Sequence, residues 1–116
     1  MAELRVEGSE LVLALSGLEK AEGVHGDLRV PWSAVRGVQV LDDAHEPADH
    51  GIKIGTRLPG VTEVGTMRER GRKIFAAVHH NTPRGLRVIL EGASYDEWIV
   101  GCADPEAVLA TLPAVT

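Results

Sequence analysis

Four basic residues are concentrated in one short stretch of the sequence. They surround Gly71, with Glu69 as the one interruption: Arg68, Arg70, Arg72 and Lys73. Several cations at one hairpin tip are able to hold a phosphate or a carboxylate through charge-assisted hydrogen bonds. Arg57, in the preceding loop, is a further candidate for such a binding surface. The alternative is a solvated turn whose charges protect a sheet edge, which is the commoner outcome and the one we favour.

The histidines suggest a second kind of chemistry, metal binding. Two segments hold histidines together with aspartates: His45 and His50 with Asp42, Asp43 and Asp49 in a loop, and His79-His80 at a predicted strand end. A zinc-like site would require the loop to fold back onto that strand end. Adjacent residues of a strand point to opposite faces, so at most one of the paired histidines joins a site. We therefore predict no metal site and no cofactor.

Catalytic motifs are not evident. Cys102 lies in an apolar run, which favours a small core residue over a nucleophile, because a reactive thiol needs exposure and a lowered pKa. The serines lack a nucleophile-elbow context, and residues 55–60 have neither the spacing nor the lysine of a phosphate-binding loop. We predict that the protein is not an enzyme.

Composition narrows the classes of partner. The chain has 116 residues, of which 44% are hydrophobic and 25% charged, as in a single folded domain covering residues 1–116. Its net charge of -5 and low aromatic content disfavour nucleic acid and anionic membranes. One cysteine excludes an intrachain disulfide, and charges interrupt the first twenty residues, so no export signal is indicated. We expect a cytoplasmic protein.

Short runs of alternating apolar and polar residues predict the elements that must position these side chains. Leu4 and Val6 are followed by a turn at Gly8-Ser9 and by an alternating run from residue 10 to 16, which predicts an opening hairpin. A third strand should run from residue 24 to Pro31, which begins a tight corner. A fourth strand should then end near residue 42.

The second half of the chain continues the same pattern. Residues 42–60 are the least regular part, and a connection this long is typical of a functional loop. Runs at residues 61–67, 74–80 and 86–91 predict a hairpin meander. A last strand over residues 95–103 should place Trp98, Val100 and Cys102 on one face. Trp98 is predicted to lie in the core, and Trp32 at the corner less firmly so.

The final element has the clearest boundary. Asp104 is a typical N-cap, Pro105 suits the first helical position, and Glu106 is favoured in the first turn. Val108, Leu109 and Leu112 then form one apolar stripe. We predict a short amphipathic helix over about residues 104–112 that packs on the open end of a curved sheet.

Spaced glycines and prolines, a few apolar positions and the capped helix together form a pattern along the chain. Its members are residues 26–31, Val35, Val38, residues 55–61, Gly65-Thr66, Phe75, Tyr95-Asp96 and residues 104–106. This pattern resembles small bacterial proteins of the pleckstrin-homology-like (PH-like) superfamily, over about residues 24–112. The resemblance implies about seven antiparallel strands in a barrel or sandwich of two near-orthogonal sheets, capped by one C-terminal helix.

The resemblance implies little about function, because such domains bind lipids, peptides or proteins. Members that bind phosphoinositides use basic residues in the first hairpin, whereas the turn here reads Glu7-Gly8-Ser9-Glu10. We therefore expect a binding or scaffolding module that recognises a protein or peptide, or self-associates, through an exposed strand edge or through residues 51–61. The alternative is a small anionic ligand or a phospholipid headgroup bound by the arginine and histidine surface.

Overall fold

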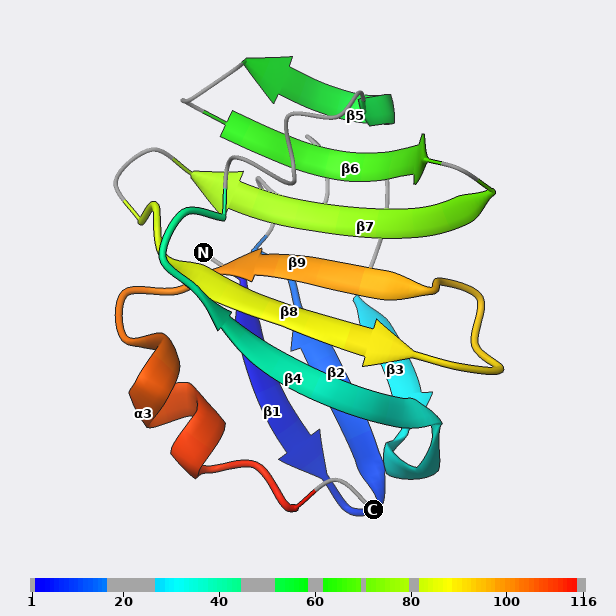
Figure 1. Cartoon of the computed structure of the whole chain (residues 1–116), viewed down its shortest axis with the longest axis vertical. Coiled ribbons are helices and arrows are strands. Elements are labelled where there is room, and N and C mark those ends of the chain that lie inside the picture. The colour runs from blue at the N-terminus through cyan, green and yellow to red at the C-terminus, as the bar shows by residue number, and fades with distance from the viewer. Residues whose placement is uncertain are drawn as a thin grey trace.

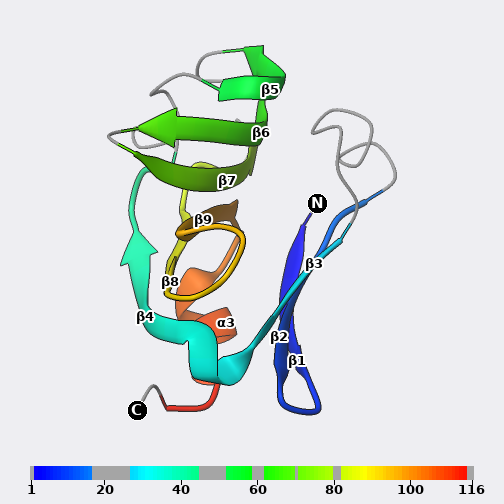
Figure 2. The ribbon, with the colours of Figure 1, turned by 90° about the vertical axis from the view of Figure 1, so that its right-hand side faces the viewer.

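The computed structural model describes residues 2–16, 27–44, 52–58, 62–69, 71–79 and 82–114. These residues form nine strands, one turn of 3-10 helix and a short C-terminal α-helix. The strands make two sheets that face each other as separate layers (Figures 1 and 2). The protein is therefore mainly β with one C-terminal helix, as the sequence predicts.

The smaller sheet contains the beginning of the chain. Its three antiparallel strands are β1 (Glu3–Glu7), β2 (Glu10–Ala14) and β3 (Leu28–Pro31), in that order. The first two are joined at Gly8-Ser9, where Gly8 has a φ of 61° that suits glycine in a tight turn. The predicted opening hairpin is confirmed.

A tight corner carries the chain from the smaller sheet to the larger one. Residues Trp32–Ala34 form the 3-10 turn η1, directly after Pro31. The backbone N–H of Trp32 donates to the carbonyl of Ser9 at 2.8 Å, which fixes the corner against the first hairpin. The corner predicted from Pro31 is confirmed.

The larger sheet has six strands in the order β4-β8-β9-β7-β6-β5. Their bounds are β4 (Val35–Leu41), β5 (Ile52–Leu58), β6 (Thr62–Glu69), β7 (Arg72–His79), β8 (Gly85–Leu90) and β9 (Glu97–Gly101). Neighbouring strands are antiparallel except for β7 and β9, which are parallel.

The position of β9 corrects the predicted meander. The β6–β7 pair is a hairpin as expected, but β9 lies between β7 and β8 and separates them. All five residues of β9 are buried. A strand that is buried on both faces needs neighbours on both sides, so it takes a central place in the sheet.

Two further expectations need correction. Residues 42–60 are not irregular throughout, because β5 occupies Ile52–Leu58 and pairs with β6. The strand number also differs: the described residues form nine strands with one parallel pair, where about seven antiparallel strands were expected. In these residues no strand pairing joins the two sheets, so they form a sandwich and not a closed barrel.

The main core fills the space between the two sheets. Trp98 and Phe75 are the largest of its fully buried side chains, and Leu11 and Leu13 from β2 face them across the layer. Trp98, Val100 and Cys102 lie together in this core, which confirms their predicted common face. Trp32 is half-buried beside the core, and its Nε1 donates to the carbonyl of Ala114 at 3.2 Å. A second, smaller cluster lies on the outer face of the larger sheet and includes Met67, Ile74 and Ile99.

The C-terminal helix α3 (Pro105–Ala110) begins as predicted. The Asp104 side chain accepts a hydrogen bond from the backbone N–H of Ala107 at 3.2 Å, and Pro105 occupies the first turn. Arg84 adds a second anchor, because its Nη1 donates to Oε1 of Glu106 at 2.8 Å. These contacts hold the helix at one end of the sandwich (Figure 1).

Candidate functional site

The predicted basic cluster lies at the tip of the β6–β7 hairpin. Arg68 and Lys73 are directly opposite each other across the two strands, so their side chains share one face of the sheet. Arg72 is on the other face, together with Ile74. Of the other two candidates, Arg70 lies outside the described residues, and for Arg57 only the backbone position on β5 is described. The described cations of the tip therefore do not converge on one point.

Two of these cations already have partners within the protein. The Lys73 ammonium lies 4.6 Å from the centre of the Tyr95 ring, a cation–π contact. Arg72 places Nη2 3.7 Å from Oε1 of Glu97, whose side chain is only 5% exposed. Arg87 approaches the same carboxylate oxygen from β8. These contacts favour a structural role for both cations.

The histidine and aspartate segments do not provide a metal site among the described residues. His79 ends β7, where its backbone carbonyl accepts a hydrogen bond from the N–H of Thr82 at 3.1 Å. His45, His50 and His80 lie outside the described part of the chain.

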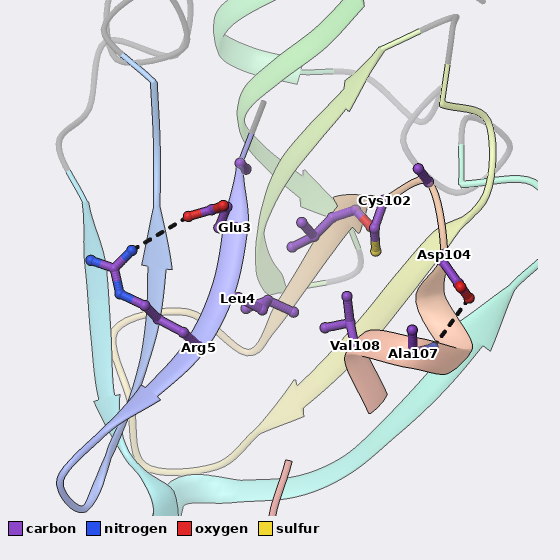
Figure 3. A pocket seen from close by; sticks show the side chains of 10 residues that line it. Glu3, Leu4, Arg5, Cys102, Asp104, Ala107 and Val108 are labelled. Atoms are coloured by element: carbon purple, nitrogen blue, oxygen red, sulfur yellow. Dashed lines mark hydrogen bonds and ion pairs between the residues drawn. The ribbon is translucent and has the colours of Figure 1, made fainter. Parts of the chain in front are cut away.

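A pocket that the sequence did not predict lies between the smaller sheet and the C-terminal helix. It has a volume of about 420 Å³ and an opening toward solvent, and its walls come from β1, from the end of β9 and from α3 (Figure 3). The residues that line it are Ala2, Glu3, Leu4, Arg5, Val100, Cys102, Ala103, Asp104, Ala107 and Val108.

The strand and the helix each present an apolar face to this pocket. Leu4 points from β1 into the pocket, and Val108 points toward it from α3 (Figure 3). Glu3 and Arg5 point the opposite way, since successive side chains of a strand alternate. Arg5 Nη1 lies 3.5 Å from Glu3 Oε2 on that far side. The interior of the pocket is thus apolar, and charged groups remain at its edge.

Cys102 places a thiol at the pocket, and this thiol is in its protonated, unreactive form. Burial raises the pKa of the Cys102 thiol to about 11, and nearby carboxylates of Asp104 and Glu106 act in the same direction. Sγ lies 3.7 Å from the carbonyl oxygen of Val100 as a weak donor. A thiol that stays protonated is a poor nucleophile, which favours apolar contact over covalent chemistry at this pocket.

The pocket borders a sheet edge. β1 is the outermost strand of the smaller sheet, and in the described part of the chain its one strand neighbour is β2. The outer edge of β1 therefore presents backbone N–H and C=O groups that are able to pair with an added strand. An edge strand beside an apolar pocket is the arrangement that strand-addition modules use.

Sequence reasoning missed this site because its walls are distant along the chain. Ala2 and Leu4 line the same pocket as Ala107 and Val108, about a hundred residues further along the chain. The available signal was small: alanines at positions 2, 103 and 107 provide little volume to fill the space between strand and helix.

No family model, no curated protein and no solved structure matches this chain. Among the described residues, no helix has the length and apolar character needed to cross a bilayer.

Proposed function

We propose that this protein is a non-catalytic binding module that recognises an extended segment of a protein or peptide by strand addition to β1. The observation that carries the proposal is the position of the apolar pocket directly beside the outer edge of this strand. Backbone hydrogen bonds to the edge supply affinity in this mode, and pockets for alternate side chains supply specificity.

The geometry of β1 supports such pairing. Leu4 is buried and faces the pocket, while Glu3 and Arg5 are exposed on the opposite face. A strand added beside β1 would also alternate, so every second side chain would lie over the pocket. Pockets of a few hundred Å³ accommodate one or two large side chains, and an apolar wall selects apolar ones.

The edge of β5 is a second place for strand addition. This strand falls within residues 51–61 and is the outermost strand of the larger sheet. We favour β1 because the pocket provides specificity there.

Binding of a small anion or a phospholipid headgroup has less support. Such a site would need several cations on one face, whereas among the described tip residues Arg68 and Lys73 share a face and Arg72 lies on the other. The acidic first hairpin argues in the same direction, since Glu7 and Glu10 flank its turn.

Kinship to the PH-like superfamily is part of the proposal. Two facing sheets and one C-terminal helix support it. The parallel β7–β9 pair and the number of strands depart from the expected pattern. Kinship of fold alone would not determine the ligand, because one fold serves many binding roles.

Selection from a library of short extended peptides, followed by amide NMR of the labelled protein, tests the binding role. We expect the selected peptides to carry a large apolar residue flanked by polar ones, and to shift the amides of residues 3–7, 103–104 and 106–108. Selected peptides that shift only the β6–β7 tip, or a library that yields no binder to protein in its monomeric form, would contradict strand addition at β1.

A pair of helix variants provides the control. Ala107 is exposed and lines the pocket, so Ala107→Trp should fill the pocket without disturbing the core. Ala110 is exposed on the same helix and does not line the pocket. Ala107→Trp should weaken peptide binding by roughly tenfold or more, and Ala110→Trp should leave it unchanged.

A further inference from the structure

The sequence of β1 is complementary to itself. Its outer face carries Glu3, Arg5 and Glu7, a strict alternation of charge. We infer that the strand added to β1 is the β1 strand of a second copy of this chain, paired antiparallel about a twofold axis through Leu4. This inference rests on the proposed strand addition at β1 and names its partner.

Charge and the position of the turn together favour this register over its neighbours. A pairing centred on Leu4 sets Glu3 opposite Arg5 of the second copy, and the twofold axis repeats that pair. A pairing centred on Arg5 would set Arg5 against itself and Glu3 against Glu7, so every opposed charge would repel. A pairing centred on Val6 would set Arg5 opposite Glu7, which is favourable, but it would also set Leu4 opposite Gly8, whose φ of 61° belongs to a turn and not to a strand.

The charged face of β1 is available for such a contact. The Glu3 side chain is 73% exposed, and within the described part of the chain its one ion pair is the 3.5 Å contact with Arg5. Arg5 is itself held more closely by Glu7, at 2.6 Å. Glu3 is thus the least well paired charge of the strand, and it is the residue that gains an opposed arginine in the dimer.

The apolar face of β1 also gains contacts in the dimer. Leu4 lies at the pocket, and the twofold axis brings Leu4 of the second copy beside it. Cross-strand apolar neighbours on one face lie within contact distance, so each copy would cover part of the other's pocket. The two three-stranded sheets would join into one continuous sheet, which removes both β1 edges from solvent.

Exchange of charges between two variants tests the pairing. Arg5→Glu makes all three outer positions acidic, and Glu3→Arg places arginine at both positions 3 and 5. Sedimentation velocity over a wide concentration range should show wild type as a dimer and each variant alone as a monomer. Each substitution affects the opposed pair twice, so the dimer dissociation constant should rise by roughly tenfold or more.

An equimolar mixture of the two variants should restore the dimer. In the mixture, the acidic positions 3 and 5 of one chain face the arginines at positions 5 and 3 of the other. Both substitutions lie on an exposed face, so circular dichroism should show folded protein in each case. If one variant fails to fold, the concentration series of wild type and of the other variant still tests the dimer.

Three results would overturn the inference: a monomeric wild type at all concentrations, a dimer formed by either variant alone, or a mixture that stays monomeric. Peptide binding at β1 then separates failure of this inference from failure of the proposed function. A monomer whose β1 amides still shift with selected peptides retains strand addition and loses only the second copy as partner. A monomer that binds no peptide at β1 loses both.

Discussion

Oε1 of Glu97 lies 3.1 Å from Nε of Arg87, on the outer face of the larger sheet. The carboxylate is 5% exposed, while the arginine side chain is 31% exposed. The contact is an ion pair without the alignment of a hydrogen bond, since that Nε has no hydrogen-bond partner among the described residues. Arg72 approaches the same oxygen at 3.7 Å. Glu97 thus places a buried carboxylate on the inner strand β9, and two arginines compensate its charge.

Replacing Glu97 should destabilise the protein. Glu97→Ala removes the common partner of two arginines and leaves a space in a buried position, so we expect a loss of about 2 to 3 kcal/mol in the free energy of unfolding. The loss stays at the low end because both arginines reach solvent. Glu97→Gln keeps the shape and an acceptor oxygen, so its loss should be smaller. Urea denaturation measures each value.

Glu91→Ala is the matched control. Glu91 also pairs with an arginine, Arg36, at 3.4 Å, but its side chain is 72% exposed. An exposed pair of this kind contributes about 0.5 kcal/mol or less. Equal losses for Glu91→Ala and Glu97→Ala would contradict the role given to burial.

Gly85 should not tolerate a larger residue. A Cβ placed on Gly85 would lie 2.2 Å from the carbonyl oxygen of Val100, a backbone atom in the neighbouring strand β9. Gly85→Ala therefore forces the two strands apart, and we expect a loss of about 2 kcal/mol or more in unfolding free energy.

Gly37→Ala is the matched control, because it adds the same methyl group to a strand glycine without the clash. The Cβ of that variant would meet the Ile89 side chain at 3.9 Å, an ordinary contact. The reduced entropy of the unfolded chain should make this change neutral or slightly stabilising. Melting curves of the two variants compare them directly, and similar shifts would show that the strand contact at Gly85 is not tight.

Asp104 should stabilise the start of α3. Its side chain accepts the backbone N–H of Ala107, so Asp104→Ala leaves that donor without its cap and should cost about 1 kcal/mol. Asp104→Asn keeps a capping oxygen and should cost clearly less. Amide hydrogen exchange of Ala107 reports the local effect, and equal protection in the alanine variant and in wild type would speak against the cap.

Local rules account for the parts of the fold that the sequence predicted correctly. Gly8 and Asp104 each determine a turn or a cap through their own backbone and side chain. Alternation within one strand is equally local, and it correctly predicts Trp98 and Cys102 on the core face.

The remaining features depend on contacts between distant segments. The sequence of β9 is apolar throughout, but only the assembled sheet determines that it lies between β7 and β8. The pocket needs β1 and α3 together, from opposite ends of the chain. The basic tip shows the converse. Arg72 and Lys73 are neighbours in sequence, but their side chains lie on opposite faces because successive side chains of a strand alternate.

Cys102 should make stability decrease at alkaline pH. Burial raises the pKa of its thiol from 9.0 to about 11. Between these values the unfolded chain releases a proton that the folded chain retains, so the free energy of unfolding falls as pH rises through this window. Below it the thiol is protonated in both states and has no effect.

The difference in unfolding free energy between wild type and Cys102→Ala isolates this contribution, because the other alkaline groups are common to both proteins. That difference should be constant near neutral pH and should shift against wild type from about pH 9 upward. A difference that stays constant to pH 11 would mean that the thiol keeps its ordinary pKa and that the pocket is wetter than its apolar lining implies.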